Sequence, residues 1–106
     1  MKDLDIIFKA LKEAVLKVPG TAETRCVLYG SRARGDYDEW SDIDIAVIVP
    51  GLTSPLKHAV LDVIADVELE HDVVLSTLVI SLGEFERLKQ RERRIALDID
   101  NEGVVL

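Results

Sequence analysis

Residues 29–47 read YGSRARGDYDEWSDIDIAV and place a polar, acidic segment between two apolar ones. The segment before it, residues 25–29, is short, partly β-branched or aromatic, and ends at Gly30, which predicts a strand followed by a turn. Residues 43–49 are nearly all apolar and β-branched, a pattern typical of a strand buried on both faces. The stretch therefore predicts a strand, a bent polar loop over residues 31–41, and a second strand.

Gly30 and Ser31 open the turn after the first predicted strand. Glycine lets the backbone approach an anion closely, and a serine at a helix start offers both its N–H and its hydroxyl. The pair could therefore bind phosphate. Because Gly-Ser is also a common turn dipeptide, the pair is weak evidence when it is taken alone.

Asp42 and Asp44 lie two residues apart at the start of the second predicted strand. Side chains alternate along a strand, so both carboxylates should lie on one face and Ile43 and Ile45 on the other. Two carboxylates that close repel each other, and a divalent cation removes that cost, since Mg²⁺ binds carboxylates together with phosphate oxygens. The alternative is that the pair lies at an exposed strand end and caps the preceding loop.

The spacing of the two pairs is more specific than either pair alone. Gly30-Ser31, ten residues and Asp42-x-Asp44 should occur by chance in roughly one chain per thousand of this length. The pattern resembles the signature of the DNA polymerase β-like nucleotidyltransferase superfamily, and GSRARG with SDIDIAV resembles its minimal nucleotidyltransferase branch. The resemblance covers nearly the whole chain. It implies an α+β fold, a small mixed β-sheet packed with helices, of the polymerase β-like palm type.

The resemblance also implies a third carboxylate on a neighbouring strand. The apolar residues 72–80 predict that strand, so we expect Asp72, which opens it, to be the third acid, with Glu70 as the alternative. An acid at a strand start beside His71 could equally have no such role.

The activity that the resemblance implies is Mg²⁺-dependent transfer of a nucleoside monophosphate, with ATP as the expected donor. Catalysis would consist mainly of positioning and electrostatics, with two Mg²⁺ ions bridging the triphosphate. The acids expected to hold the metal ions and to act in catalysis are Asp42, Asp44 and Asp72. The residues expected to bind the nucleotide are Gly30, Ser31 and Arg32.

Three side chains near this motif have open interpretations. Arg32 and Arg34 could each contact phosphate or pair with an acid of their own loop (36, 38 or 39), and we expect Arg34 to be structural or to face a partner. Trp40 could stack on a base, but we expect it to anchor its own loop. The basic residues between 87 and 94 predict a solvated helix face, with partner or phosphate contact as the alternative.

The rest of the chain predicts helices around these strands. Apolar residues at three- and four-residue spacing predict a helix over 2–18, and a second from a Ser54-Pro55 start to about Glu70. Two further helices are expected from residue 82, the last closed by Gly103. The expected order is helix, strand, strand, helix, strand, helix, helix, in one domain over residues 1–106 with Cys26 in its core.

The overall composition indicates which partners the chain can bind and in which cellular compartment it is expected. A net charge of -7 argues against direct nucleic-acid binding and suits a basic protein partner. No apolar run is long enough for a membrane span, the first residues are acidic where a signal peptide is basic, and there is one cysteine. We expect a cytoplasmic protein that does not bind membranes.

The resemblance also suggests a biological role. Larger members of the superfamily carry a second domain that recognises the acceptor, so we expect recognition here to come from another subunit, a self-dimer or the acceptor. Chains of this size resemble the antitoxins of HEPN–MNT pairs, which transfer AMP to a tyrosine of a helical HEPN ribonuclease toxin. The alternatives are a non-catalytic module that neutralises a partner by contact, and a small-molecule nucleotidyltransferase.

Overall fold

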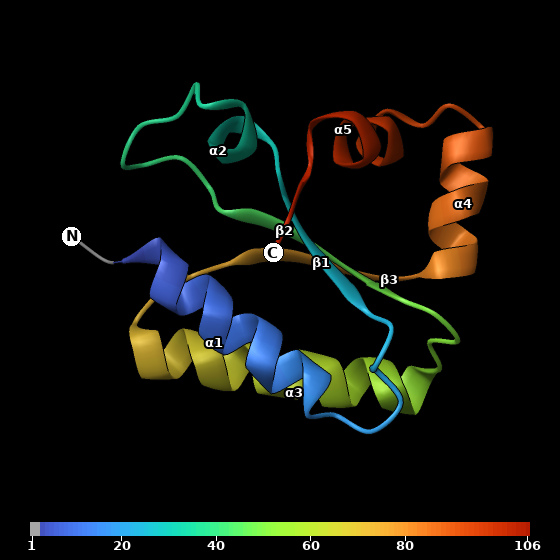
Figure 1. The fold of residues 1–106 in the computed structure, drawn as a ribbon, viewed down its shortest axis with the longest axis horizontal. Helices are drawn as coiled ribbons and strands as arrows, with labels where there is room; N and C mark the ends of the chain where they lie inside the picture. The colour runs from blue at the N-terminus through green and yellow to red at the C-terminus, as the bar shows by residue number, and fades with distance from the viewer. Residues whose placement is uncertain (1–2) are drawn as a thin grey trace.

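The computed structural model describes residues 3–106. Figure 1 shows helices on both sides of one sheet. In chain order the elements are α1 (Leu4–Leu16), β1 (Arg25–Tyr29), α2 (Ser31–Arg34), β2 (Asp44–Val49), α3 (Ser54–His71), β3 (Ser76–Ser81), α4 (Leu82–Gln90), α5 (Arg94–Glu102) and β4 (Val104–Val105).

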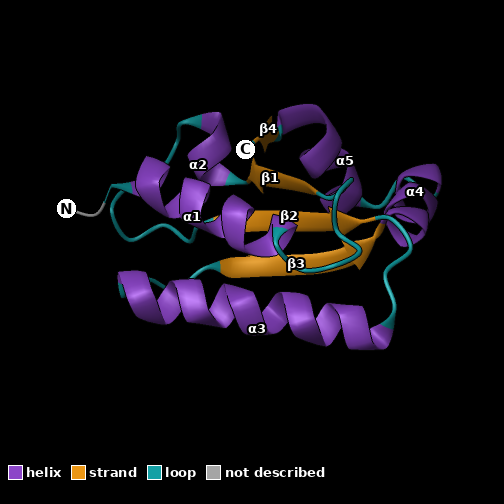
Figure 2. Ribbon diagram, turned by 60° about the horizontal axis from the view of Figure 1, so that its bottom comes forward, coloured by secondary structure: helices purple, strands orange, loops and turns teal. Residues whose placement is uncertain are grey.

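The sheet is mixed, and its strand order is β3-β2-β1-β4. β1 runs antiparallel to both β2 and β4, while β2 and β3 are parallel. The parallel pair follows from the connection, because α3 carries the chain back along the sheet before β3 begins (Figure 2). The mixed α/β architecture expected from the sequence is confirmed.

Strand β2 carries the core on both of its faces. Ile45, Val47 and Val49 pack into the cluster that includes residues of α1 and α3, whereas Ala46 and Ile48 pack into the cluster with α4 and α5. All five residues from 45 to 49 are buried, as the continuous apolar run predicts. The Asp-x-Asp pair therefore adjoins the most buried strand of the sheet.

Several predicted boundaries shift in the structure. The first helix is Leu4–Leu16 with Asp3 as its N-cap, and Lys2, with which the predicted helix begins, lies outside the described residues. Thr53, not Ser54, caps α3, because its Oγ1 accepts the Leu56 N–H at 3.3 Å. The short elements α2 and β4 were not predicted.

Among residues 3–106, no helix is both long and apolar enough to cross a membrane.

Candidate active site

Gly30 is the residue that joins β1 to α2, and it lies directly against Asp44. Its φ of 75° is in the region that favours glycine. A Cβ built on Gly30 would lie 2.5 Å from Oδ2 of Asp44. The position thus requires glycine twice, once for the backbone conformation and once for the close approach of a carboxylate. The structure brings Gly30 of the Gly-Ser turn against Asp44 of the Asp-x-Asp pair, as the motif spacing predicts.

The two carboxylates alternate with buried apolar residues. Ile43 is 7 % exposed and Ile45 is fully buried, whereas Asp42 is exposed and Asp44 is half-buried. Asp44 lies on the face of β2 that it shares with Ala46, the face toward α4 and α5. Both acids are therefore on the same side of the strand and open to solvent.

Asp44 stands in a row of three residues across the sheet. Its partner in β1 is Tyr29 and its partner in β3 is Ser76. Burial raises the pKa of the Tyr29 phenol, and the negative charge of Asp44 raises it further. The row Tyr29–Asp44–Ser76 marks the end of the sheet where the site lies.

Arg32 holds the loop that leads to Asp42. Its Nε and Nη2 donate to the carbonyl oxygen of Ser41 at 3.2 and 3.1 Å, and Nη2 also donates to the Asp38 carbonyl at 3.4 Å. The guanidinium lies over the Tyr37 ring, 4.8 Å from its centroid. The residue immediately before Asp42 is thus fixed by a two-pronged contact, and the contact of Arg32 with phosphate stays a prediction.

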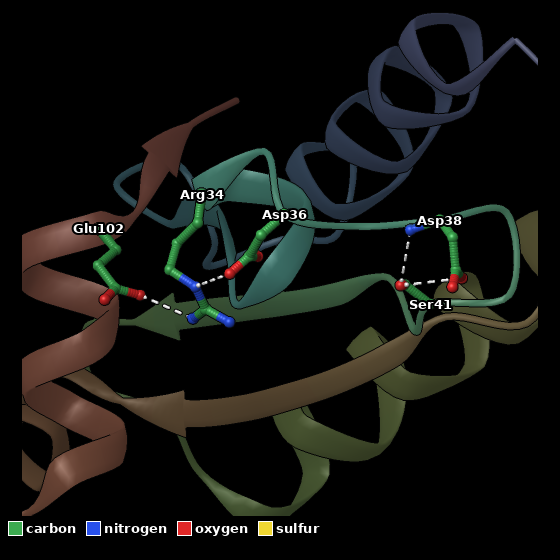
Figure 3. Close-up of polar contacts among 5 residues, drawn as sticks. All are labelled: Arg34, Asp36, Asp38, Ser41 and Glu102. Atoms are coloured by element: carbon green, nitrogen blue, oxygen red, sulfur yellow. Dashed lines mark hydrogen bonds and ion pairs between the residues drawn. The ribbon is translucent and has the colours of Figure 1, made fainter.

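A tight turn completes the same loop (Figure 3). The Asp38 N–H donates to Ser41 Oγ at 3.1 Å, and this hydroxyl donates to Asp38 Oδ1 at 3.3 Å. Trp40 donates its backbone N–H to the same carboxylate at 2.9 Å, but its side chain is 85 % exposed. The expectation that the indole anchors the loop is therefore wrong, since the backbone and Asp38 do so.

Arg34 links α2 to the distant helix α5. Its Nε donates to Asp36 at 3.2 Å and its Nη1 to Glu102 at 3.0 Å (Figure 3). These hydrogen bonds, first that to Glu102 and then that to Asp36, raise the pKa of the Arg34 guanidinium. The expected structural role of Arg34 is confirmed, and Asp36 is among the partners that the sequence suggests.

The predicted strand start at Asp72 is wrong. Asp72 is the C-cap of α3, with φ 48° and ψ 56°, and β3 begins only at Ser76. Glu70, the alternative third acid, lies within α3. Across residues 3–106 no three histidine, cysteine or acidic side chains form a group able to hold a metal ion. Asp44 thus begins β2 two residues after Asp42, and the β3 residue level with Asp44 is Ser76 and not an acid.

Three of the basic residues near the end of the chain lie on α4 and α5 and form ion pairs with acids of the same two helices, whereas Arg91 and Arg93 lie in the exposed connection between these helices. Arg87 pairs with Glu84, Lys89 pairs with Asp100 at 3.3 Å, and Arg94 lies 3.9 Å from Asp98. This arrangement favours a solvated helix surface for the cluster.

Comparison with known proteins identifies the class to which this fold and motif belong. The nucleotidyltransferase domain family matches residues 4–100. The chain therefore belongs to this family, whose members generally use a nucleoside triphosphate and a divalent metal.

Two individual proteins are similar to the chain. A protein of Methanocaldococcus jannaschii named "Putative protein adenylyltransferase" is 31% identical over 74 residues, which are 69% of this chain and 75% of that protein. The crystal structure of a "putative nucleotidyltransferase" from Sulfolobus solfataricus superposes with a TM-score of 0.51 at 23% identity. That alignment covers 96% of this chain and 83% of the other, and it supports the fold.

Proposed function

We propose that this chain transfers AMP from ATP to a hydroxyl group of a protein. The observation that carries this proposal is the close contact of Gly30 with Asp44. The Gly-Ser turn, which we propose binds phosphate, thus lies against one of the two carboxylates that we propose hold the metal. Family membership supports nucleotidyl transfer. The relative named as a protein adenylyltransferase supports a protein acceptor and an adenylyl group.

The donor set of the site fits a divalent cation. Asp42 and Asp44 present two carboxylates on one side of a strand, partly open to solvent, and Mg²⁺ takes one or two carboxylates together with water and phosphate oxygens. When bound, the cation supplies positive charge that neutralises the triphosphate and the charge that develops during transfer.

The chain's own residues would bind and orient the nucleotide. Ser31 begins the short helix α2, in which the Ala33 and Arg34 N–H groups donate to the Gly30 carbonyl. The Ser31 hydroxyl and the N–H groups of Ser31 and Arg32 would therefore be the groups that donate to phosphate oxygens. Arg32 fixes the Ser41 carbonyl and with it the position of Asp42. These residues would hold the α-phosphorus in line with the attacking oxygen.

The reaction is a substitution at phosphorus. The acceptor oxygen forms a bond to the α-phosphorus of ATP while the bond from that phosphorus to the bridging oxygen breaks. Pyrophosphate leaves, and the acceptor hydroxyl releases its proton. AMP ends on the acceptor in a phosphodiester.

We further propose that the acceptor is a tyrosine of a helical HEPN ribonuclease toxin and that the chain acts as its antitoxin. The net charge of -7 supports a basic protein partner, since complementary potentials accelerate encounter.

The experiment incubates the chain with α-labelled ATP, Mg²⁺ and the helical protein encoded next to it. Label should enter that protein, and Asp42→Asn or Asp44→Asn should abolish labelling and the loss of toxicity. Asp62→Asn, which changes an exposed carboxylate on α3, is the matched control. If no label is transferred and the Asp42 and Asp44 variants still neutralise the partner, neutralisation occurs by contact and the proposal is wrong.

A further inference from the structure

The register of β2 with β3 determines which side chain stands beside Asp44. The Ser76 N–H donates to the Ile43 carbonyl at 2.9 Å, and this hydrogen bond fixes the alignment at the first residue of β3. Ser76 is therefore level with Asp44, and residues level in a sheet project from the same face. The side chain next to Asp44 on β3 is a hydroxyl, and it is exposed.

Of the acids that precede β3 in the chain, one accepts a backbone hydrogen bond, and another ends α3 in a left-handed and not an extended backbone conformation. Glu68 accepts the Leu75 N–H on its Oε2 at 2.9 Å, so this carboxylate holds the start of the strand. Asp72 ends α3 in the left-handed region, four residues before the strand begins. Val74, two residues before Ser76, is 85 % exposed and apolar. Asp72 thus lies outside β3, and the β3 residue level with Asp44 is Ser76.

We propose that Asp42 and Asp44 are the only protein carboxylates of this centre and that Ser76 occupies the position of a third. The site would then bind one divalent cation with the nucleotide and not two. This inference rests on the proposed function, because it concerns the metal at the same site.

The physical reason lies in the number of anionic ligands. One cation is satisfied by one or two carboxylates and the phosphate oxygens of the nucleotide. A second cation on the acceptor side would need a further anionic ligand, and a neutral serine hydroxyl is a poor substitute for a carboxylate. Ser76 can donate or accept a hydrogen bond, but it cannot offset the charge of a second ion.

The test is a titration of the whole chain with Mn²⁺ in the presence of saturating non-hydrolysable ATP analogue, with free Mn²⁺ followed by electron paramagnetic resonance. The wild-type chain should bind one Mn²⁺ with the analogue. The Ser76→Asp variant should bind two Mn²⁺ ions. The Ser76→Asn variant, whose new side chain has the size of aspartate but no charge, should bind one. Asp72→Asn should also bind one.

A second measurement follows folding in the same samples. Without metal, Ser76→Asp places a third negative charge beside Asp44 and should lower the thermal midpoint, and Mn²⁺ should restore it. Ser76→Asn should show no such metal dependence beyond that of the wild type.

Three outcomes would overturn the inference. Two Mn²⁺ ions on the wild type would contradict it directly. A loss of the bound ion in Asp72→Asn would show that Asp72 is a ligand. If neither Mn²⁺ nor the analogue binds any variant, the proposed function fails, and the inference fails with it.

Discussion

Gly30 and Asp44 are in such close contact that the glycine cannot be replaced without displacing the acid. The Cβ of any other residue would lie 2.5 Å from Asp44 Oδ2, far inside van der Waals contact. The Gly-Ser part of the motif therefore has a steric role toward the Asp-x-Asp part, besides its expected role toward phosphate.

Gly30→Ala should abolish nucleotidyl transfer and destabilise the chain. The cost should be about 1–3 kcal/mol, because the variant combines a positive φ with a clash against Asp44. Urea unfolding and a labelled-ATP transfer assay measure the two effects.

Two other glycines serve as matched controls for this variant. At Gly35, φ is 88° but a Cβ meets nothing within 4 Å, so Gly35→Ala isolates the backbone strain. Gly83 lies within α4 with open space around it, so Gly83→Ala should stabilise the chain by about 0.4–1 kcal/mol. Equal activity in the Gly30 and Gly35 variants would contradict the role of the Asp44 contact.

Arg32→Lys should impair transfer almost as much as Arg32→Ala. A lysine ammonium cannot reproduce the two-pronged contact with the Ser41 carbonyl, so Asp42 loses its fixed position. We expect about a tenfold or greater loss in kcat, and faster hydrogen exchange in the loop between Gly35 and Ser41. If only the KM for ATP rises and the loop exchanges as in the wild type, Arg32 acts on phosphate instead.

The Cys26 thiol should be inert and should impose a pH dependence on stability. Burial raises its pKa from 9.0 to about 11. Between these values the unfolded chain loses the proton and the folded chain keeps it, so stability is fully present below pH 9 and falls as the pH rises toward 11. The loss should be about 2 kcal/mol or somewhat more.

Urea unfolding between pH 8 and 11 measures this slope for wild type and Cys26→Ala. The variant should be less stable throughout, because it leaves a small cavity, but it should lack the cysteine contribution to the slope. Iodoacetamide should modify Cys26 in urea and not in the folded chain. Rapid alkylation of the folded protein would contradict its burial.

Glu102→Gln should have a small effect on stability. The Arg34 and Glu102 side chains are 41% and 34% exposed, and exposed ion pairs contribute little to stability because solvent and salt screen them. A double-mutant cycle with Arg34→Gln isolates the pair. A coupling that vanishes in high salt is expected, and a coupling that persists in high salt would contradict this expectation.

The sequence predicted the elements whose signals are local. Continuous apolarity identified β2, and the turn after β1 and the motif spacing identified Gly30, Ser31, Asp42 and Asp44 as one group. The close approach of Gly30 and Asp44 is confirmed by the structure, whereas the chemical roles of the four residues stay predictions. These features depend on residues near one another in the chain, so a single sequence contains them.

The features that were missed depend on distant contacts or on an unusual backbone. Glu102 meets Arg34 across 68 residues, and the two residues of β4 form a strand only because they pair with β1. Asp72 adopts a positive φ that is uncommon for residues other than glycine. Neither the acidic side chain of Asp72 nor the apolar residues after it predict that α3 extends to His71.

Asp42 and Asp44 differ in what holds them. Asp44 begins the strand that is buried on both faces, so its backbone should exchange hydrogen only when the whole domain unfolds. Asp42 follows a loop held by the Arg32 side chain and by the turn between Asp38 and Ser41, and this loop should open locally at a much lower free energy. The carboxylate pair thus combines one rigid member with one adjustable member. Substitutions in the loop could therefore change how well the two acids converge while the melting temperature stays the same.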